Sequence, residues 1–406
     1  MRIKLIVLIS IIFQYTFAQL PGIKTPNTEF GCEIPFEYIN HFMIVKLYVN
    51  GFLPCNFIFD TGAEHTIITK REISEILGIQ YEKEFKIIGA DLKTVMTAYL
   101  AKKFQYKLQG GTEGEQDVLV LADDYINLDD YTGIQIHGIL GADAFLNGVV
   151  KINYESQKIQ FIKTEYFDEN QNKYSKIPII ISKSKPYLSA NTIISDSNTV
   201  NIKLLLDTGA NLGILLYPND SIGLKIPDKI IQGSLGAGLG GQVFGVIGRL
   251  KQFNIDQFNF GSLPSTFQVL DTSYFINPSN RNGILGNLIL ERFHVIIDYN
   301  RSNLYFKPNK NYDKSFLIDR SGLFVLASGY NSQTYTVHHV LANSPASDAG
   351  ILKGDIIIKI GWLSSSMYSL DEVLLKFKGK NGKKVKLKIL RSGKKLKKTI
   401  YLRDLI

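Results

Sequence analysis

The feature that most constrains the fold of this chain is the repetition of two short motifs. Asp-Thr-Gly-Ala occurs at 60–63 and again at 207–210, an offset of 147 positions. Gly-Ile-Leu-Gly occurs at 138–141 and again at 283–286, an offset of 145 positions. Two different motifs that recur at nearly one offset indicate two copies of one folding unit. We therefore expect homologous units at residues 29–164 and 174–308.

Both units have the pattern of β structure. The chain contains 21 Tyr and 24 Phe, residues that favour strands. After each Gly-Ile-Leu-Gly come a short apolar segment, a strand, a turn (residues 154–157 or 299–302) and a second strand. The segment 70–79 is the best helix candidate of the first unit. The sequence therefore predicts a mainly β, bilobal fold.

Each repeated aspartate lies in an apolar setting, in FIFDTGAEHTII (57–68) and LLLDTGANLGILL (204–216). An ionised carboxylate is costly there unless it is paired or shares its proton. Two carboxyls brought together share one proton and titrate as a pair. The ionised member takes a proton from water, and the protonated member donates to a carbonyl oxygen. Asp60 and Asp207 are therefore the candidate catalytic residues for amide hydrolysis by water.

The residues that follow each aspartate fit this chemistry. Gly62 and Gly209 permit a tight turn and bring backbone N–H groups close to the carboxylates. Thr61 and Thr208 are placed to hydrogen-bond across to the opposite strand and to lock the two loops together. We expect these four residues to support the pair of aspartates.

Together, these motifs resemble those of the aspartic peptidases of the retropepsin and pepsin type. In that family the hydrophobic-hydrophobic-Gly segment threads beneath the catalytic loop. Aspartic proteases are the standard example of two carboxyls that share a proton. The resemblance implies the bilobal acid-protease β-barrel fold, with both aspartates in one chain, so that a monomer suffices. Ala63 and Ala210 are retropepsin-like and imply a milder pH optimum than that of pepsin.

The family closes a β-hairpin flap over its substrate. Residues 86–100 and 232–248 occupy the corresponding places, which makes Gly89, Gly238 and Gly240 candidate flap residues. The string GAGLGG at 236–241 also fits the G-x-G-x-x-G dinucleotide pattern. That pattern needs a helix after it, and residues 242–253 have no helical start.

Other chemistries find little support in the sequence. None of the six histidines has metal-binding spacing, and no G-x-S-x-G motif is present. His65 is expected to face away from the aspartates. We expect no metal, no organic cofactor and no nucleic-acid partner.

The pattern changes near residue 315. The string NSPASDAGILKGDII (343–357) predicts a short helix over 346–349 and a strand that opens at 354–357. Residues 315–406 resemble a PDZ domain, a small β-sandwich with one or two helices that binds an extended peptide at a sheet edge. The resemblance places peptide binding at Gly322, Leu323 and Phe324. Ser321 and these three residues depart from the commonest Gly-Leu-Gly-Phe form, and the alternative is a domain that only packs against the protease.

The N-terminus predicts export. Arg2 and Lys4 precede an apolar stretch at 5–13, and residues 16–18 resemble a cleavage site. The stretch is short for a membrane span, so we interpret 1–18 as a signal peptide that leads to the periplasm, cell envelope or exterior. Export would permit a disulfide between Cys32 and Cys55, with two buried thiols as the alternative.

The formal net charge of +9 is unevenly distributed. Residues 376–406 hold thirteen Lys or Arg against one acid, and the chain between the signal peptide and this region carries −5. In KKVKLKIL (383–390), apolar residues alternate with lysines, which predicts a half-buried strand with a solvated basic face. Binding to a polyanion or an anionic membrane surface is the alternative reading.

The favoured hypothesis is an exported aspartic endopeptidase that acts on proteins or peptides and carries a PDZ domain. The second hypothesis is a non-catalytic peptide-binding or scaffold protein that retains the fold.

Overall fold

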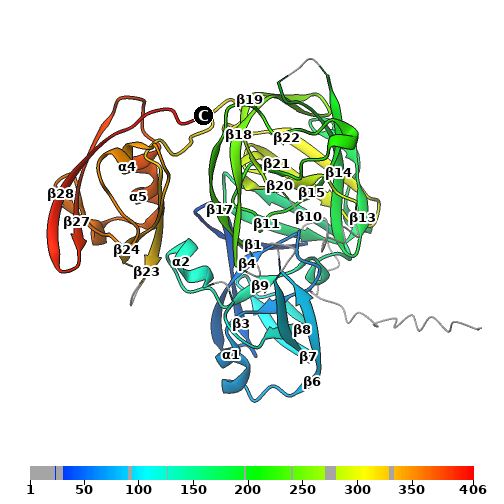
Figure 1. The fold of residues 1–406 in the computed structure, drawn as a ribbon. Helices are drawn as coiled ribbons and strands as arrows, with labels where there is room; N and C mark the ends of the chain where they lie inside the picture. Colours follow the sequence, from blue (N-terminus) through cyan, green and yellow to red (C-terminus); the bar gives the residue numbers. More distant parts are fainter. Residues whose placement is uncertain are drawn as a thin grey trace, which may run out of the picture.

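The computed structural model describes residues 23, 31–89, 94–125, 127–195, 198–238, 241–269, 280–328 and 333–406. The described chain is mainly β, as predicted (Figure 1). The predicted signal peptide, residues 1–18, lies outside the described residues.

Lobe 1 is built on one sheet, which has eight strands in the described residues. Their spatial order is β2 (Glu37–Ile39), β3 (Phe42–Val49), β4 (Leu53–Phe59), β9 (Gly138–Leu140), β5 (Ile67–Ile68), β8 (Glu113–Leu121), β7 (Val95–Leu108) and β6 (Tyr81–Ile88). The Gly-Ile-Leu-Gly strand β9 lies beside β4, parallel to it, with Phe59 opposite Leu140.

Lobe 2 repeats this arrangement strand for strand, with eight strands in its described residues. Their order is β13 (Ile180–Ser182), β14 (Lys185–Ile193), β15 (Val200–Leu206), β20 (Gly283–Leu285), β16 (Ile214–Leu216), β19 (Phe258–Phe267), β18 (Gly241–Ile255) and β17 (Ile231–Gly238). Here β20 lies parallel to β15, with Leu206 opposite Leu285. The sequence repeat is therefore a repeat of sheet topology.

A third sheet joins the lobes. Within the described residues it has the order β1 (Cys32–Pro35), β11 (Lys158–Ile162), β10 (Val149–Asn153), β21 (Phe293–Asp298), β22 (Asn303–Pro308) and β12 (Ser175–Pro178). The central pair, β10 and β21, comes from different repeats and runs antiparallel from Val149–Asp298 to Asn153–His294. One apolar core continues through both lobes.

Helices are few and short in the described residues. Lobe 1 has α1 (Arg71–Ile76), inside the predicted segment 70–79, and α2 (Leu128–Thr132), and lobe 2 has α3 (Asn287–Leu290). The turns at 154–157 and 299–302 join β10 to β11 and β21 to β22, as predicted.

The C-terminal domain has its own sheet and its own apolar core. The strand order is β23 (Leu323–Ser328), β24 (Thr334–Val340), β25 (Ile356–Ile360), β27 (Lys384–Arg391) and β28 (Lys394–Tyr401), and β26 (Leu363–Ser364) pairs with β25. Its helices are α4 (Pro345–Asp348) and α5 (Leu370–Phe377). A capping box between Ser369 and Glu372 fixes the start of α5.

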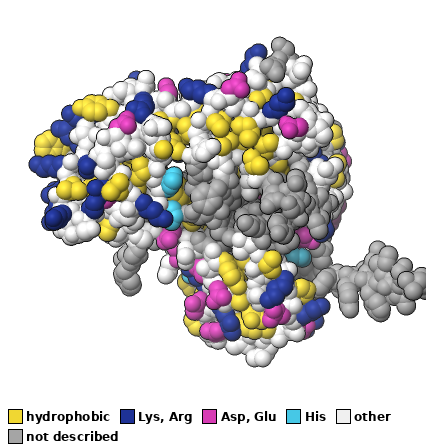
Figure 2. Space-filling model, viewed as in Figure 1, with side chains coloured by type: hydrophobic (Ala, Val, Ile, Leu, Met, Phe, Trp, Pro, Cys, Tyr) yellow, Lys and Arg dark blue, Asp and Glu magenta, His cyan; other side chains and the backbone are white. Residues whose placement is uncertain are grey.

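Basic side chains cover this domain (Figure 2). In β27, buried Val385, Leu387 and Ile389 alternate with exposed or half-exposed lysines, as the sequence pattern predicted. Cys32 and Cys55 are buried free thiols, which decides between the two alternatives left open above. None of the helices in the described part of the chain is long and apolar enough to cross a membrane.

Candidate active site

The two aspartates occupy equivalent positions just after β4 and β15. The Asp60 N–H donates to the Leu140 carbonyl of β9 at 3.0 Å, and the Asp207 N–H donates to the Leu285 carbonyl of β20 at 2.9 Å. Each Gly-Ile-Leu-Gly strand therefore holds the backbone of one aspartate. This explains why the two motifs repeat together.

The two threonines interlock the loops. The Thr61 hydroxyl donates to the Leu206 carbonyl at 2.7 Å, and the Thr208 hydroxyl donates to the Phe59 carbonyl at 2.9 Å. Each hydroxyl also accepts the backbone N–H of the other threonine, at 3.0 and 3.1 Å. Both side chains are fully buried. Four hydrogen bonds thus cross the boundary between the lobes directly behind the aspartates.

The two glycines leave room for the opposite carboxyl. A Cβ on Gly62 would lie 2.5 Å from Asp207 Cγ, and a Cβ on Gly209 would overlap the carboxyl of Asp60 more severely. Both distances are far inside van der Waals contact. Any side chain at either position would push the aspartates apart.

The carboxyls hydrogen-bond to each other, and their environments differ. Asp60 Oδ1 accepts the N–H groups of Gly62 at 2.7 Å and Ala63 at 3.0 Å, whereas Asp207 Oδ1 accepts only that of Gly209, at 2.9 Å. Hydrogen bonds to a carboxylate favour its ionised form. Asp60 is therefore the better site for the negative charge, and Asp207 for the shared proton.

The pKa directions agree with this assignment. Burial raises the pKa of Asp60, and the Gly62 N–H is the strongest of the contacts that oppose it. Burial and the adjacent Asp60 raise the pKa of Asp207 well above its ordinary value. The pair therefore shares one proton, which lies mainly on Asp207.

Two cations of lobe 2 act on the pair. Lys185, at the start of β14, lowers the pKa of Asp60, and Arg281, just before β20, lowers the pKa of Asp207. Lys185 Nζ lies 3.9 Å from Glu64 Oε2, and burial lowers its own pKa. Arg281 Nη2 donates to the Tyr217 hydroxyl at 3.3 Å. Both cations favour the negative charge on the aspartates.

Asn287 supports the lobe 2 loop from below. Its fully buried amide nitrogen donates to the Thr208 carbonyl at 2.6 Å and to the His41 carbonyl at 2.8 Å, and its oxygen accepts the Tyr154 hydroxyl at 2.7 Å. The residue thus joins the Asp207 loop of lobe 2 to lobe 1.

The sequence analysis did not single out Asn287, Lys185 or Arg281. Asn287 could have been found from the sequence. It follows Gly-Ile-Leu-Gly at the position where the first repeat has Ala142, and a polar residue in an otherwise apolar repeat suggests a specific role. Lys185 lies 22 residues before Asp207, outside both motifs, and Arg281 lies two residues before the second Gly-Ile-Leu-Gly, but neither position by itself predicts a contact with the aspartates.

Lobe 1 has a polar network behind its loop. Asp143 Oδ1 accepts both the N–H and the hydroxyl of Thr66 at 3.0 Å, and Gln116 donates to the Thr66 hydroxyl at 2.5 Å. His65 Nδ1 lies 3.2 Å from Asp143 Oδ2, a contact that raises the pKa of His65. His65 therefore pairs with Asp143 rather than with the aspartate pair.

Comparisons with known proteins agree with this geometry. Residues 45–144 match the family model described as aspartyl protease, and residues 336–391 match the one described as PDZ domain. The chain therefore contains a segment similar to aspartyl proteases and, toward its C-terminus, a segment similar to PDZ domains. No curated protein matches the chain in sequence. The protease match lies in lobe 1, and lobe 2 is related to it through the shared strand order and the second Asp-Thr-Gly loop.

The predicted flap glycines lie on the edge hairpins of the protease lobes. Gly89 follows β6 and donates to the Thr94 carbonyl at 2.8 Å, and Gly238 ends β17 opposite Gly241. Gly240 lies outside the described residues. The role of both hairpins as flaps stays a prediction.

The predicted peptide-binding residues of the PDZ domain have three different surroundings. Gly322 has a φ of 77°, in the region that favours glycine. Leu323 is buried in the PDZ core, whereas Phe324 points toward lobe 1 and lies 6.3 Å from the Tyr131 ring.

Within the described residues, no group of three His, Cys, Asp or Glu side chains could hold a metal ion.

Proposed function

We propose that this protein is an aspartic endopeptidase that hydrolyses peptide bonds of proteins or peptides. One observation carries the proposal: two loops locked together by threonine hydrogen bonds bring two carboxyls into contact, and Asp60 accepts more backbone N–H groups than Asp207. A binding protein does not need two half-buried acids in contact, because they are costly to keep.

Each aspartate has a distinct role in the proposed reaction. Water adds to the carbonyl carbon while Asp60 takes one water proton and Asp207 gives its proton to the carbonyl oxygen. The resulting diol then breaks its C–N bond. The nitrogen takes the proton held by Asp60, and Asp207 recovers a proton from a diol hydroxyl. Both carboxyls end in their starting states, so the cycle needs no covalent intermediate.

The unequal hydrogen bonding supports this division of labour. Two N–H groups and Lys185 favour the ionised form of Asp60, and burial beside a negative neighbour keeps the proton on Asp207. Because one chain supplies both acids, we propose that a monomer is sufficient. The signal-like N-terminus supports export as part of the proposal.

The decisive experiment is cleavage of denatured casein and of a peptide library by the mature protein, from acid to neutral pH, with and without pepstatin. Asp60→Asn should lower the rate by roughly 10²–10⁴-fold, the usual size of a general acid–base contribution. Circular dichroism should show an unchanged fold. If wild type and variant behave alike, the protein is a scaffold that retains the protease fold.

A further inference from the structure

The edge of the PDZ sheet faces the protease. The edge strand β23 has only β24 as a neighbour within the described sheet. Strand edges present N–H and C=O groups that pair with an added strand, which is how PDZ domains bind extended peptides. In Figure 1, α2 of lobe 1 lies beside β23, between the two domains. We therefore asked whether this edge is open to a peptide.

The turn that precedes β23 already has internal acceptors. Asp319 Oδ1 accepts the N–H groups of Ser321 at 3.0 Å and of Gly322 at 2.6 Å. The N–H of Leu323 donates to the Ser321 hydroxyl at 3.0 Å. A terminal carboxylate would be captured by such a run of backbone N–H groups. Here a side-chain carboxylate of the same chain takes that place.

The gap between β23 and α5 is filled by lobe 1. Gly133 follows α2, and a Cβ built on it would lie 3.3 Å from Leu370 Cβ of α5 and 3.9 Å from Ala327 Cβ of β23. Tyr131 lies two residues before Gly133 and packs its ring against that of Phe324, with 6.3 Å between the ring centroids. Leu326 of β23 is buried in the same apolar cluster as α2. The α2 segment therefore covers β23 where the strand faces α5.

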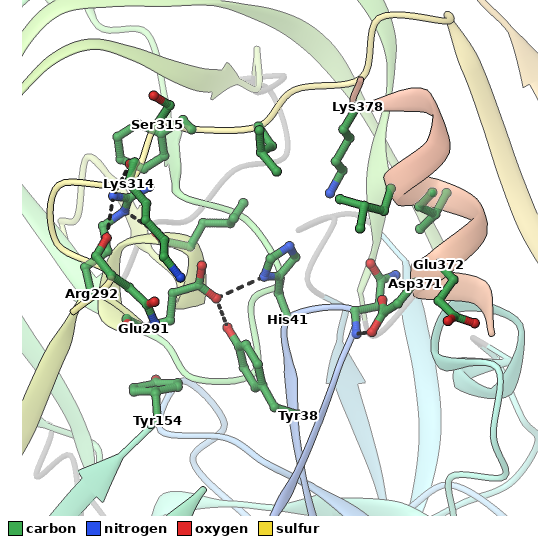
Figure 3. Close-up of a pocket in the computed structure, with 17 residues that line it drawn as sticks. Tyr38, His41, Tyr154, Glu291, Arg292, Lys314, Ser315, Asp371, Glu372 and Lys378 are labelled. Atoms are coloured by element: carbon green, nitrogen blue, oxygen red, sulfur yellow. Dashed lines mark hydrogen bonds and ion pairs between the residues drawn. The ribbon is translucent and has the colours of Figure 1, made fainter. Parts of the chain in front are cut away.

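Polar contacts fix the start of α5 to lobe 1. Asp371 Oδ2 accepts the N–H of Asn40 at 2.8 Å, and the Asn40 amide nitrogen donates to the Tyr131 carbonyl at 2.9 Å. Beside this contact is a cavity of about 400 Å³ between the lobes and α5. Figure 3 shows Asp371 of α5 and Lys378, the residue after α5, on one side of it and Glu291, with His41 and Tyr38, on the other.

We propose that the peptide groove of the PDZ domain is an internal docking site, and that its occupant is the α2 segment of lobe 1, residues 128–134. With α2 in the groove, the domain does not bind the free C-termini of other peptides. Its function is to hold α2 against the protease. This inference does not rest on peptidase activity, because it concerns only the contact between the domains.

The docked segment is directly connected to the aspartate pair. The Ile136 N–H donates to Asp129 of α2 at 2.9 Å, and β9 begins two residues after Ile136. The last residue of β9, Leu140, accepts the N–H of Asp60. Release of α2 would therefore loosen the strand that holds the Asp60 loop. A partner that displaced α2 from the groove would act on the site through β9.

The docking can be tested with an engineered disulfide in the full-length chain. Gly133→Cys with Ala327→Cys places two Cβ atoms at a separation that disulfides require, about 3.5–4.5 Å. The matched control is Gly133→Cys with Lys397→Cys, on the exposed far-edge strand β28. We expect nearly complete crosslinking under mild oxidation for the first pair and none for the control, read by non-reducing peptide mapping. Equal, low crosslinking of both pairs would overturn the proposal.

A double-mutant cycle covers the case in which Gly133→Cys does not fold. Tyr131→Ala and Phe324→Ala should be non-additive in the unfolding of the full chain, because they remove the two sides of one contact. Additive effects would contradict the docking.

Peptide binding gives an independent readout. The wild-type chain should show no saturable binding of free C-terminal peptides below about 1 mM, by fluorescence polarisation. Micromolar binding that is lost on C-terminal amidation would show an open groove and overturn the proposal.

Hydrogen exchange tests the link to the aspartates. Tyr131→Ala should speed amide exchange in 137–140 by about tenfold, because α2 loses its contact with β23. The control, Tyr401→Ala on β28, should leave these amides unchanged. Unchanged exchange in both variants would overturn the connection through β9.

Discussion

The surroundings of the two aspartates make them unequal although their motifs are identical. Asp60 receives two backbone N–H groups and Asp207 receives one. Lys185 adds a cation that lowers the pKa of Asp60. The negative charge and the proton are therefore assigned to different residues by the conformation of the two Asp-Thr-Gly-Ala loops and by a cation that lies outside the motif.

Replacement of Lys185 should move the acid limb of the pH–rate profile. Activity needs Asp60 ionised and is lost as pH falls through its pKa. Since Lys185 lowers that pKa, Lys185→Met should raise it and shift the acid limb of kcat/KM to higher pH. Lys185→Arg keeps the charge and should stay close to wild type. A shift of the same size in both variants would show that the charge is not the cause.

Asp207→Asn should change stability in a pH-dependent way. The folded-state pKa of Asp207 is raised, so its stabilising contribution is complete at acid pH and is lost as pH rises through that pKa. The neutral amide avoids this loss. The variant should therefore melt above wild type at neutral pH, by about 2–4 °C per kcal/mol relieved, and match it in acid. A neutral-pH Tm below that of wild type would contradict the raised pKa of Asp207.

Among the structural elements, the two Asp-Thr-Gly-Ala loops and the strands β9 and β20 hold the aspartates in place. Each loop is held by β9 or β20 of its own lobe and by a threonine of the other lobe. The geometry of the aspartates therefore depends on both repeats at once. A fault in either loop should be transmitted to the other.

Thr208→Val tests this interlock. The change removes the hydroxyl that donates to the Phe59 carbonyl and accepts the Thr61 N–H. Each buried group left without a partner costs about 1–3 kcal/mol. We expect lower stability in urea unfolding and reduced cleavage. Thr208→Ser keeps the hydroxyl and should recover most of both, whereas equal loss in the two variants would indicate a packing defect.

Among the apolar clusters of the described residues, a small one joins lobe 1 to Leu326 of the PDZ domain, and two larger ones each belong to one unit. One runs through both lobes, and the other belongs to the PDZ domain. The shared sheet, paired at β10 and β21, makes the lobes one structural unit. We therefore expect the two lobes to unfold in one transition and the PDZ domain to unfold in a separate one.

Calorimetry of the full chain checks this division. Ile297→Ala in β21 should lower only the transition of the lobes, and Phe377→Ala in α5 only that of the PDZ domain, because both side chains are fully buried in separate cores. The expected costs are about 2–5 and 3–5 kcal/mol, respectively. Two separate transitions for lobes 1 and 2 would contradict a single core.

The sequence by itself determined the repeat, the β class, the pair of aspartates and the presence of a PDZ domain. Each of these can be recognised from short contiguous segments, such as the two Asp-Thr-Gly-Ala motifs. The half-buried basic strand at 384–391 was equally readable from its period of two. Only the tertiary structure decided which aspartate holds the proton, since the packing of the loops sets which backbone N–H groups reach Asp60 and brings Lys185 near it. It also decided that Cys32 and Cys55 stay apart as thiols and that α2 fills the PDZ groove. Contacts between distant segments depend on how the domains pack, and no short string of residues encodes that packing.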